Sequence, residues 1–250
     1  MNGATPIPIV ILSGGEGNKL FLSKDETPKC MEKILGRPFV EHQLELFANK
    51  GAGEVTLLLG KFGGAVESYL DDECAGLSLK YIYDDYRIPP GTGSALLNAY
   101  HQLPEQFILT YGDTYPDFPW FGATFQDPFA MQPVRMTIYK NEGKHFPSNV
   151  EIDEATGEIV AYNNHVHSPQ DAARLKYIEA GLLYVNKSAL CYRLKRGLDD
   201  TLCDLVKLGM VATFETKERY YNIGVPSGAR ELERHLLLSS RITIPEESRR

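Results

Sequence analysis

The chain has 250 residues, with 26 lysines and arginines against 33 aspartates and glutamates, and therefore a formal net charge of −7. This acidic balance argues against general binding to nucleic acid or to an anionic membrane, because both need a basic face. It leaves room for a local basic pocket that holds a small phosphorylated ligand. The apolar runs are too short to span a bilayer, and at this length one large core is expected.

Cysteine usage and the first residues favour a cytoplasmic protein. The cysteines are widely spaced and form no C-x-x-C pair, which favours reduced, packed thiols over a disulfide framework or a zinc site. They are Cys30, Cys74, Cys191 and Cys203. The chain enters a strand-like run almost at once, without the basic and apolar segments of a signal peptide.

The first half alternates apolar strand-like runs with helical patterns. Strands are expected at 7–12, 55–59, 77–83 and 107–111, and helices at 39–50, 65–70 and 93–100. This order predicts an α/β fold, a Rossmann-like and mostly parallel sheet with helices on both faces. The carboxyl ends of parallel strands meet at one edge, where ligands bind in open α/β sheets. The turn at 13–17 and the Gly112-Asp113 pair are expected at that edge.

The second half is less regular and has no internal repeat. Strands are expected at 134–140, 150–152, 159–162, 178–185 and 212–215, helices at 202–208 and 227–240, and a polar loop at 163–173. We expect a single domain over residues 1–240, with halves 1–125 and 126–240. A polar tail, 241–250, follows it.

A glycine-rich turn follows the first expected strand, with the sequence Ser13-Gly14-Gly15-Glu16-Gly17-Asn18-Lys19-Leu20, and Pro28-Lys29 lies beyond it. The glycines let backbone N–H groups approach a phosphate chain closely. The two lysines can supply charge-assisted contacts to phosphate oxygens. On spacing alone, an ordinary turn with solvated lysines explains the run equally well. It is not a P-loop, because no Gly-Lys-Ser/Thr follows, and the missing last glycine disfavours a dinucleotide site.

This run resembles the nucleotide-binding loop of the sugar-phosphate nucleotidyltransferases, whose pattern is G-G-x-G-T-R-L followed by P-K. Five later segments resemble the motifs of that family in the same order. They are 36–39 before the first long helix, 90–95 beside the nucleobase, 111–114 at a metal-binding aspartate, 177–181 on a sugar-contacting strand and 223–226 before the last helix. The set is most similar to the short branch that includes mannose- and heptose-1-phosphate guanylyltransferases and N-acetylmuramate-1-phosphate uridylyltransferase.

The resemblance implies an Mg²⁺-dependent enzyme that joins a nucleoside triphosphate and a sugar 1-phosphate to give a nucleotide-diphospho-sugar and pyrophosphate. Such chemistry asks the protein mainly for positioning and charge neutralisation. Residues 1–125 would bind the nucleotide and 126–240 the acceptor. The implied catalytic residues are Lys29, Lys19 and Asp113, and the implied metal ligands are Asp113 and Asn222. The implied nucleotide-binding residues are Ser13, Gly14, Gly15, Gly17, Gly91, Thr92 and Gly93, and the implied acceptor-binding residues are Tyr111, Asn149, Glu179 and Gly181.

Three features differ from the family pattern. Asn18 and Lys19 replace threonine and arginine, and lysine loses the planar two-point contact to phosphate. Asn222 replaces a metal-binding aspartate of many members, and Asn164 replaces a lysine that contacts the substrate phosphate. A nearby basic side chain, Lys176 or Arg174, could supply that charge. These changes leave open an enzyme with an unusual, even non-sugar, phosphorylated acceptor, and a non-catalytic relative that binds nucleotide sugars.

The remaining candidates favour structural roles. His42 is expected to pack at the core edge, and Asp84 and Asp85 to solvate a turn. The pair His165 and His167 lacks a third metal ligand. The aromatic group Phe118, Trp120 and Phe121 is expected to anchor a loop. Its alternatives are a wall for the acceptor or a contact in a homo-oligomer.

Overall fold

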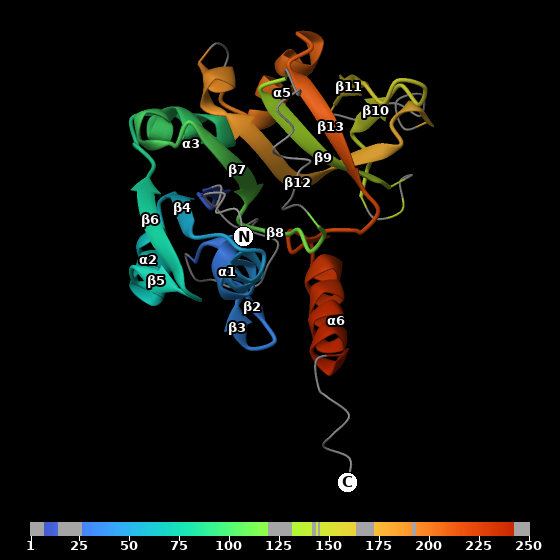
Figure 1. The fold of residues 1–250 in the computed structure, drawn as a ribbon. Helices are drawn as coiled ribbons and strands as arrows, with labels where there is room; N and C mark the ends of the chain where they lie inside the picture. The colour runs from blue at the N-terminus through green and yellow to red at the C-terminus, as the bar shows by residue number, and fades with distance from the viewer. Residues whose placement is uncertain are drawn as a thin grey trace, which may run out of the picture.

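The computed structural model describes residues 8–14, 27–119, 132–141, 144, 146–163, 173–191 and 194–242 (Figure 1). Several expectations fall outside these ranges and concern Gly15, Gly17, Asn18, Lys19, Trp120, Phe121, Asn164, His165, His167 and residues 243–250 of the polar tail.

A ten-stranded sheet forms the centre of the molecule, in the order β11-β10-β12-β7-β1-β4-β6-β5, with β9 and β13 attached through β12. Four strands of its N-terminal part are parallel to one another. They are β1 (Ile9–Leu12), β4 (Glu54–Leu59), β6 (Leu77–Tyr83) and β7 (Gln106–Tyr111). The expected α/β fold with a mixed, mostly parallel sheet is confirmed.

Beyond β7 the strands change direction. The long strand β12 (Tyr177–Asn186) runs antiparallel to β7, and also to β9 (Val134–Lys140) and β10 (Val150–Ile152). The strand β11 (Ile159–Tyr162) continues from β10, and β13 (Val211–Thr216) lies parallel to β9. Three short pairings complete the strands, formed by β2 (Lys33–Ile34) with β3 (Arg37–Pro38), β5 (Glu73–Cys74) with β6, and β8 (Thr114–Tyr115) with β14 (Tyr221–Asn222).

Helices cover both faces of the sheet because the strand β1 is apolar on both sides. Its Ile9 and Ile11 pack in one core cluster, whereas Val10 and Leu12 pack in the other. The first cluster includes side chains of α1 (Phe39–Asn49), α2 (Gly64–Leu70) and α6 (Pro226–Ile242), and the second includes α3 (Thr92–Ala99) and α5 (Leu198–Lys207). Short 3-10 turns occur at η1 (Lys29–Met31), η2 (Tyr100–Gln102) and η3 (Lys187–Leu190).

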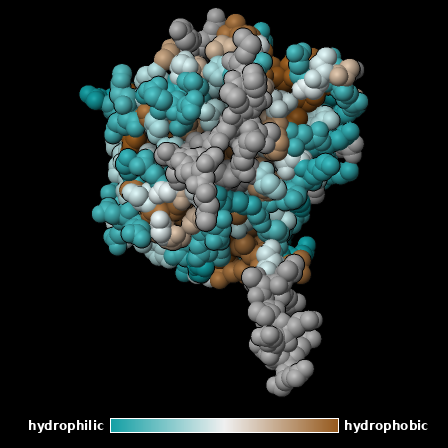
Figure 2. Space-filling model, viewed as in Figure 1, coloured by the Kyte–Doolittle hydropathy of each residue, from teal (hydrophilic) through white to brown (hydrophobic). Residues whose placement is uncertain are grey.

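Much of the visible surface of the molecule is hydrophilic (Figure 2). Figure 2 shows hydrophilic side chains over much of the coloured surface of one face, and Figure 1 shows α6 extending away from the sheet. Within the described ranges, no helix combines the length and the apolar character needed to cross a membrane. The four cysteines form no disulfide; Cys30 is buried and Cys74 and Cys203 are partly buried, whereas Cys191 is exposed, so the expectation of packed thiols is wrong for Cys191.

The register of the parallel strands brings three strand ends together. Leu12 lies opposite Leu58 of β4 and Tyr111 of β7. Just beyond it, the N–H of Ser13 donates to the carbonyl of Leu58, and the N–H of Gly112 donates to the carbonyl of Leu12. The segments that leave β1 and β7 therefore lie side by side at the carboxyl edge of the sheet, as predicted.

Candidate functional site

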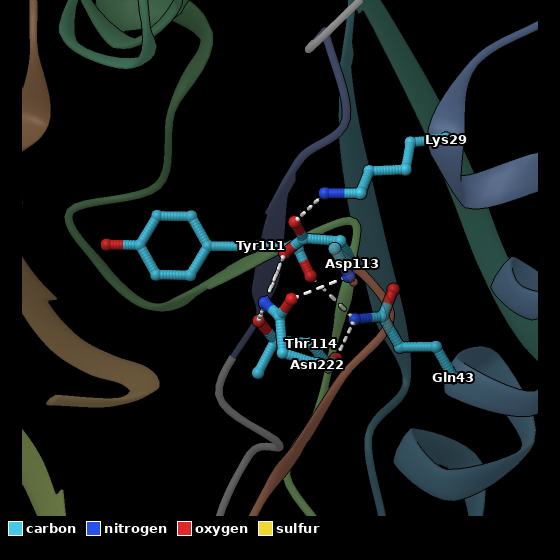
Figure 3. A network of polar contacts seen from close by, with 7 residues as sticks. Lys29, Gln43, Tyr111, Asp113, Thr114 and Asn222 are labelled. Atoms are coloured by element: carbon cyan, nitrogen blue, oxygen red, sulfur yellow. Dashed lines mark hydrogen bonds and ion pairs between the residues drawn. The ribbon is translucent and has the colours of Figure 1, made fainter. Parts of the chain in front are cut away.

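An ion pair occupies the carboxyl edge of the sheet. Asp113 lies two residues beyond the end of β7, and Lys29 begins the η1 turn. The Lys29 Nζ atom lies 2.7 Å from Asp113 Oδ2, and the two side chains are only 24% and 26% exposed (Figure 3). A charge-assisted hydrogen bond at this partial burial is stronger than a solvated surface pair. The structure thus brings together two of the three expected catalytic residues.

Asn222 approaches the same carboxylate with its amide nitrogen. Its Nδ2 donates to Asp113 Oδ1 over 3.1 Å and to Thr114 Oγ1 over 3.2 Å. Its Oδ1 accepts from the backbone N–H of Gly224 over 2.7 Å, which fixes the orientation of the amide. The pairing of β14 with β8 sets Asn222 opposite Thr114. Asn222 therefore stabilises the Asp113 carboxylate as a hydrogen-bond donor in this conformation.

The donor set around Asp113 can be compared with the needs of Mg²⁺. This ion takes oxygen ligands and is commonly held by one or two carboxylates together with substrate phosphates. In the described part of the chain, no group of three or more His, Cys, Asp or Glu side chains gathers around a metal position. Asp113 fits an ion whose other ligands are phosphate oxygens and water. Asn222 would join it only with the amide turned over and its bond to Gly224 broken.

A buried glutamine holds the turn that carries Asp113. Gln43 lies on α1 and is fully buried. Its Nε2 donates to the carbonyls of Tyr111 over 2.8 Å and Thr114 over 2.6 Å, on either side of Asp113 (Figure 3). A Cβ atom at Gly112 would lie 2.6 Å from Ser13 Oγ and 3.1 Å from Ser13 Cα, so a larger residue there would force Ser13 to shift. Gln43 has a positioning role that the sequence analysis missed, and its signal was an amide within an apolar helix face.

A cavity of about 460 Å³ lies on one side of the ion pair. Its lining includes the predicted nucleotide residues Ser13, Gly14, Gly91 and Thr92, together with Lys29 and Asp113. Gly93 is not part of this lining. A Cβ there would lie 1.9 Å from the carbonyl oxygen of Lys195, and the Gly93 N–H donates to the carbonyl of Arg196. Gly93 therefore serves close packing against the segment before α5.

Asp84 contributes to the same cavity, so the expectation that it only solvates a turn is wrong. Asp84 is the first residue after β6, and it lines the cavity. Its Oδ2 lies 3.0 Å from the position that a Cβ of Gly14 would take. Burial raises the pKa of its carboxyl group. Its neighbour Asp85 behaves as expected for a solvated turn, since hydrogen bonds from the exposed Arg87 lower its pKa to about 2. The position of Asp84 at a strand end was the available signal.

A second cavity, of about 260 Å³, lies on the other side of Asp113. All four predicted acceptor residues line it, namely Tyr111, Asn149, Glu179 and Gly181. Tyr111 and Asp113 line both cavities. Asp113 therefore stands where a ligand in one cavity would meet a ligand in the other.

Glu179 is the most strongly perturbed acid of this second cavity. Its Oε2 accepts hydrogen bonds from the hydroxyl groups of Tyr111, over 3.2 Å, and Tyr162, over 3.5 Å. Burial, and next the charge of Asp199, raise the pKa of Glu179 to about 7. The backbone N–H of Glu179 donates to Asn149 Oδ1 over 2.9 Å, which fixes the strand beside the cavity.

Other candidates lie away from the two cavities. His42 is buried, with Nε2 2.8 Å from the carbonyl oxygen of Ile34, so its expected place at the core edge is confirmed. Arg174 pairs with Glu151, and Lys176 pairs with Glu154. Neither basic residue lines the acceptor cavity. In this conformation they do not replace the charge that Asn164 lacks.

Comparison with known proteins places the fold and the sequence in context. No protein-family model matches the chain. It is 31% identical over 108 residues to D-glycero-alpha-D-manno-heptose 1-phosphate guanylyltransferase of Campylobacter jejuni, covering 43% of this chain and 48% of the relative. It is 28% identical over 193 residues to the catalytic subunit beta of mannose-1-phosphate guanylyltransferase of Drosophila pseudoobscura pseudoobscura, covering 72% and 48%. The matches thus span less than half the length of these curated relatives.

Among solved structures, HddC of Yersinia pseudotuberculosis superposes with a TM-score of 0.73 at 22% identity, over 92% of this chain and 99% of that one. The same protein in complex with GMP-PN superposes with a TM-score of 0.72 at 21% identity, again over 92% and 99%. These likenesses show a shared fold. The fold and the two cavities that meet at Asp113 define an α/β protein with a mixed sheet and a hollowed carboxyl edge. In sequence, the chain is similar to a heptose-1-phosphate guanylyltransferase and to a mannose-1-phosphate guanylyltransferase.

Proposed function

We propose that the chain transfers a nucleotidyl group from a nucleoside triphosphate to a sugar 1-phosphate. The observation that carries this proposal is the Lys29–Asp113 pair, 2.7 Å apart, at the junction of the two cavities. A phosphate oxygen of the acceptor attacks the α-phosphorus of the triphosphate and forms a new P–O bond. The bond from the α-phosphorus to the oxygen that bridges to the β-phosphorus breaks, and pyrophosphate leaves with that oxygen.

Lys29 supplies positive charge for this step. Its ammonium group stands at the cavity that contains Ser13 and Gly14. There it can exchange Asp113 for phosphate oxygens of the triphosphate. A cation held in a partly buried place acts in a lower effective dielectric than water and needs little reorganisation during the reaction. Lys19, outside the described ranges, is proposed as a second phosphate contact.

Mg²⁺, when bound, supplies further positive charge on the phosphate oxygens as they crowd together. Asp113 would hold it with the substrate phosphates. Gln43 fixes the turn on both sides of Asp113, and the Asn222 amide holds the carboxylate in place. These contacts therefore fix the position of one carboxylate, that of Asp113.

The comparisons support this assignment in two ways. HddC, which shares the fold, has been solved with GMP-PN, a nucleotide analogue. The relative from Campylobacter jejuni is a guanylyltransferase that acts on a heptose 1-phosphate. A magnesium-dependent transfer to a phosphorylated sugar is the proposal that unites these likenesses with the two cavities.

The orientation of Asn222 favours one alternative, a non-catalytic relative that binds nucleotide sugars. Residue 222 is an amide instead of a second carboxylate, and it turns its nitrogen, not its oxygen, toward Asp113. A transferase with a non-sugar phosphorylated acceptor remains the other alternative, because no lysine lies at position 164.

The test is pyrophosphate release from a matrix of common nucleoside triphosphates and sugar 1-phosphates with Mg²⁺. We expect turnover with at least one pair. Lys29→Met is expected to lower kcat/KM by roughly 10²- to 10³-fold, the loss typical of one preorganised charge contact. Lys33→Met, four residues away and exposed on β2, is the matched control and is expected to keep full activity. Nucleotide-sugar binding without turnover under every divalent metal would support the non-catalytic alternative instead.

A further inference from the structure

The acceptor cavity has an acidic lining. Among its described lining residues, three are carboxylates, Asp113, Glu179 and Asp199, and none is a lysine or an arginine. Lys29 compensates Asp113 from the nucleotide side. Asp199, together with Glu179 when its carboxyl group is ionised, therefore leaves an excess of negative charge in a cavity whose proposed ligand already carries a phosphate.

Glu179 has an unused acceptor atom in this cavity. The residue is only 8% exposed, and it is one of the buried side chains that line the hollow. Tyrosine hydroxyl groups bind Oε2, whereas the buried Oε1 accepts no hydrogen bond from the described part of the chain. Buried polar atoms in folded proteins are nearly always paired. Because Glu179 lines the cavity, a ligand that donates a hydrogen bond to this carboxyl group would give the unpaired atom a partner.

Asp199 adds a second charge close to Glu179. It lies in the first turn of α5, and its charge contributes to the raised pKa of Glu179. Two carboxylates that interact across a cavity destabilise each other unless a cation or a proton lies between them. A ligand hydroxyl would satisfy Oε1 but would leave this repulsion in place. An ammonium group carries three donors and one positive charge, and it removes both costs.

Resting on the proposed transfer reaction, we propose that the phosphorylated acceptor carries a protonated amino group, which Glu179 and Asp199 bind. The phosphate of the acceptor lies toward Asp113, and its amino group lies at the opposite, acidic part of the cavity. The two carboxylates thus select the acceptor, and Lys29 and Asp113 act on its phosphate. The class of ligand is an amino-bearing phosphate, of which an amino sugar 1-phosphate and an aminoalkyl phosphate are two sources.

The first experiment compares matched acceptors on the full chain. Glucosamine 1-phosphate is tested against glucose 1-phosphate and N-acetylglucosamine 1-phosphate, and phosphoethanolamine against ethyl phosphate. Pyrophosphate release gives kcat/KM, and calorimetry gives acceptor affinity independently of turnover. We expect the amine to raise affinity by roughly ten- to hundredfold in one of the two sets, as for hydrogen bonds to charged groups. The set that responds identifies the sugar or the aminoalkyl source.

The second experiment removes one charge from the cavity. Asp199→Asn is expected to reduce the preference for the amine by about tenfold or more, with little effect on the neutral acceptor. Asp200→Asn is the matched control, because Asp200 is exposed on the same helix turn and does not line the cavity. The proposal is overturned if neutral acceptors bind as well as their amines, if no amine binds, or if Asp199→Asn leaves the preference unchanged.

The two readouts separate this inference from the reaction it rests on. Amine-selective binding without pyrophosphate release from any acceptor would refute the transfer reaction but support the ammonium subsite. Turnover that is equal for neutral and aminated acceptors would support the reaction and refute the subsite.

Discussion

Gly181 stands at the wall between the acceptor cavity and the Asp113 turn, and its replacement by alanine tests how tightly that wall is packed. Gly181 has a φ of +74°, a left-handed conformation that disfavours residues with a Cβ. An added Cβ would lie 2.4 Å from Cγ2 and 3.2 Å from Cβ of Thr114. Thr114 is only 1% exposed, so it has no open space into which to move.

The expected cost has two parts. The left-handed conformation costs about 1–2 kcal/mol, and forcing a methyl group into a packed site typically costs about 1–3 kcal/mol. Gly181→Ala should therefore lower the free energy of unfolding by roughly 2–5 kcal/mol. Gly157 provides the control, because its φ is +75° but nothing lies within 4 Å of its added Cβ. Gly157→Ala should show only the first part.

The assay is thermal unfolding of both variants under the same conditions. One kcal/mol shifts the Tm of a domain of this size by roughly 2–4 °C, so Gly181→Ala should melt roughly 2–12 °C below Gly157→Ala. Replacing Thr114 by serine removes Cγ2 and should recover part of the loss in the Gly181→Ala background. Equal losses in the two alanine variants, or no recovery with Thr114→Ser, would refute the close contact between β12 and the Asp113 turn.

Two further predictions concern the acids and the amide of the site. The pKa of Glu179 rises from 4.5 to about 7 on folding. The unfolded chain therefore releases this proton first, and stability should fall by about 3 kcal/mol as the pH rises from 4.5 through 7. Urea unfolding across this range should show that decline in the wild type and lose it in Glu179→Gln; parallel profiles would contradict it. Asn222→Asp replaces a donor to Asp113 by a second carboxylate, which should cost about 1–3 kcal/mol without metal. Added Mg²⁺ should then raise the Tm of this variant more than that of the wild type, and an equal response would count against a donor role for Asn222.

Much of the fold could be predicted because its strands carry strong local patterns. The strands at 77–83, 134–140, 150–152 and 159–162 have the expected bounds, since their apolar or alternating runs end at clear turns. Strand direction beyond β7 was not predictable in the same way. Whether β12 pairs parallel or antiparallel with β7 depends on the path of the chain between them, and no local pattern records that path.

The residues that sequence analysis missed depend on distant partners. The sequence pattern predicts a helix that begins at 202, whereas α5 begins at Leu198. Asp199 therefore lies in the first turn of α5. The N–H of Leu198 donates to Thr92 Oγ1 over 2.8 Å, a contact across 106 residues. A helix start that relies on a side chain so far away has no local signature. The same holds for Gln43, whose carbonyl partners lie on a turn about seventy residues further along the chain.

Glycine-rich segments show a related ambiguity. The segment 90–95 resembles a loop that lies beside a nucleobase, and the resemblance implies that Gly91, Thr92 and Gly93 bind the nucleotide. For Gly91 and Gly93, however, the described neighbours are the backbone atoms of Arg196 and Lys195. Glycine spacing alone does not distinguish the approach of a ligand from that of another chain segment. Gly91 meets both conditions, because it packs against Arg196 and lines the nucleotide cavity.

The position of Asp113 follows from three pairings that are all remote in sequence. Parallel pairing of β7 with β1 sets its turn beside Ser13, antiparallel pairing of β7 with β12 sets Gly181 and Glu179 near it, and pairing of β8 with β14 brings Asn222 to its carboxylate. The first pairing opens the nucleotide cavity and the second opens the acceptor cavity. A single aspartate therefore belongs to both cavities because β7 lies between a parallel and an antiparallel neighbour. That arrangement explains why the change from parallel to antiparallel pairing coincides with the candidate site.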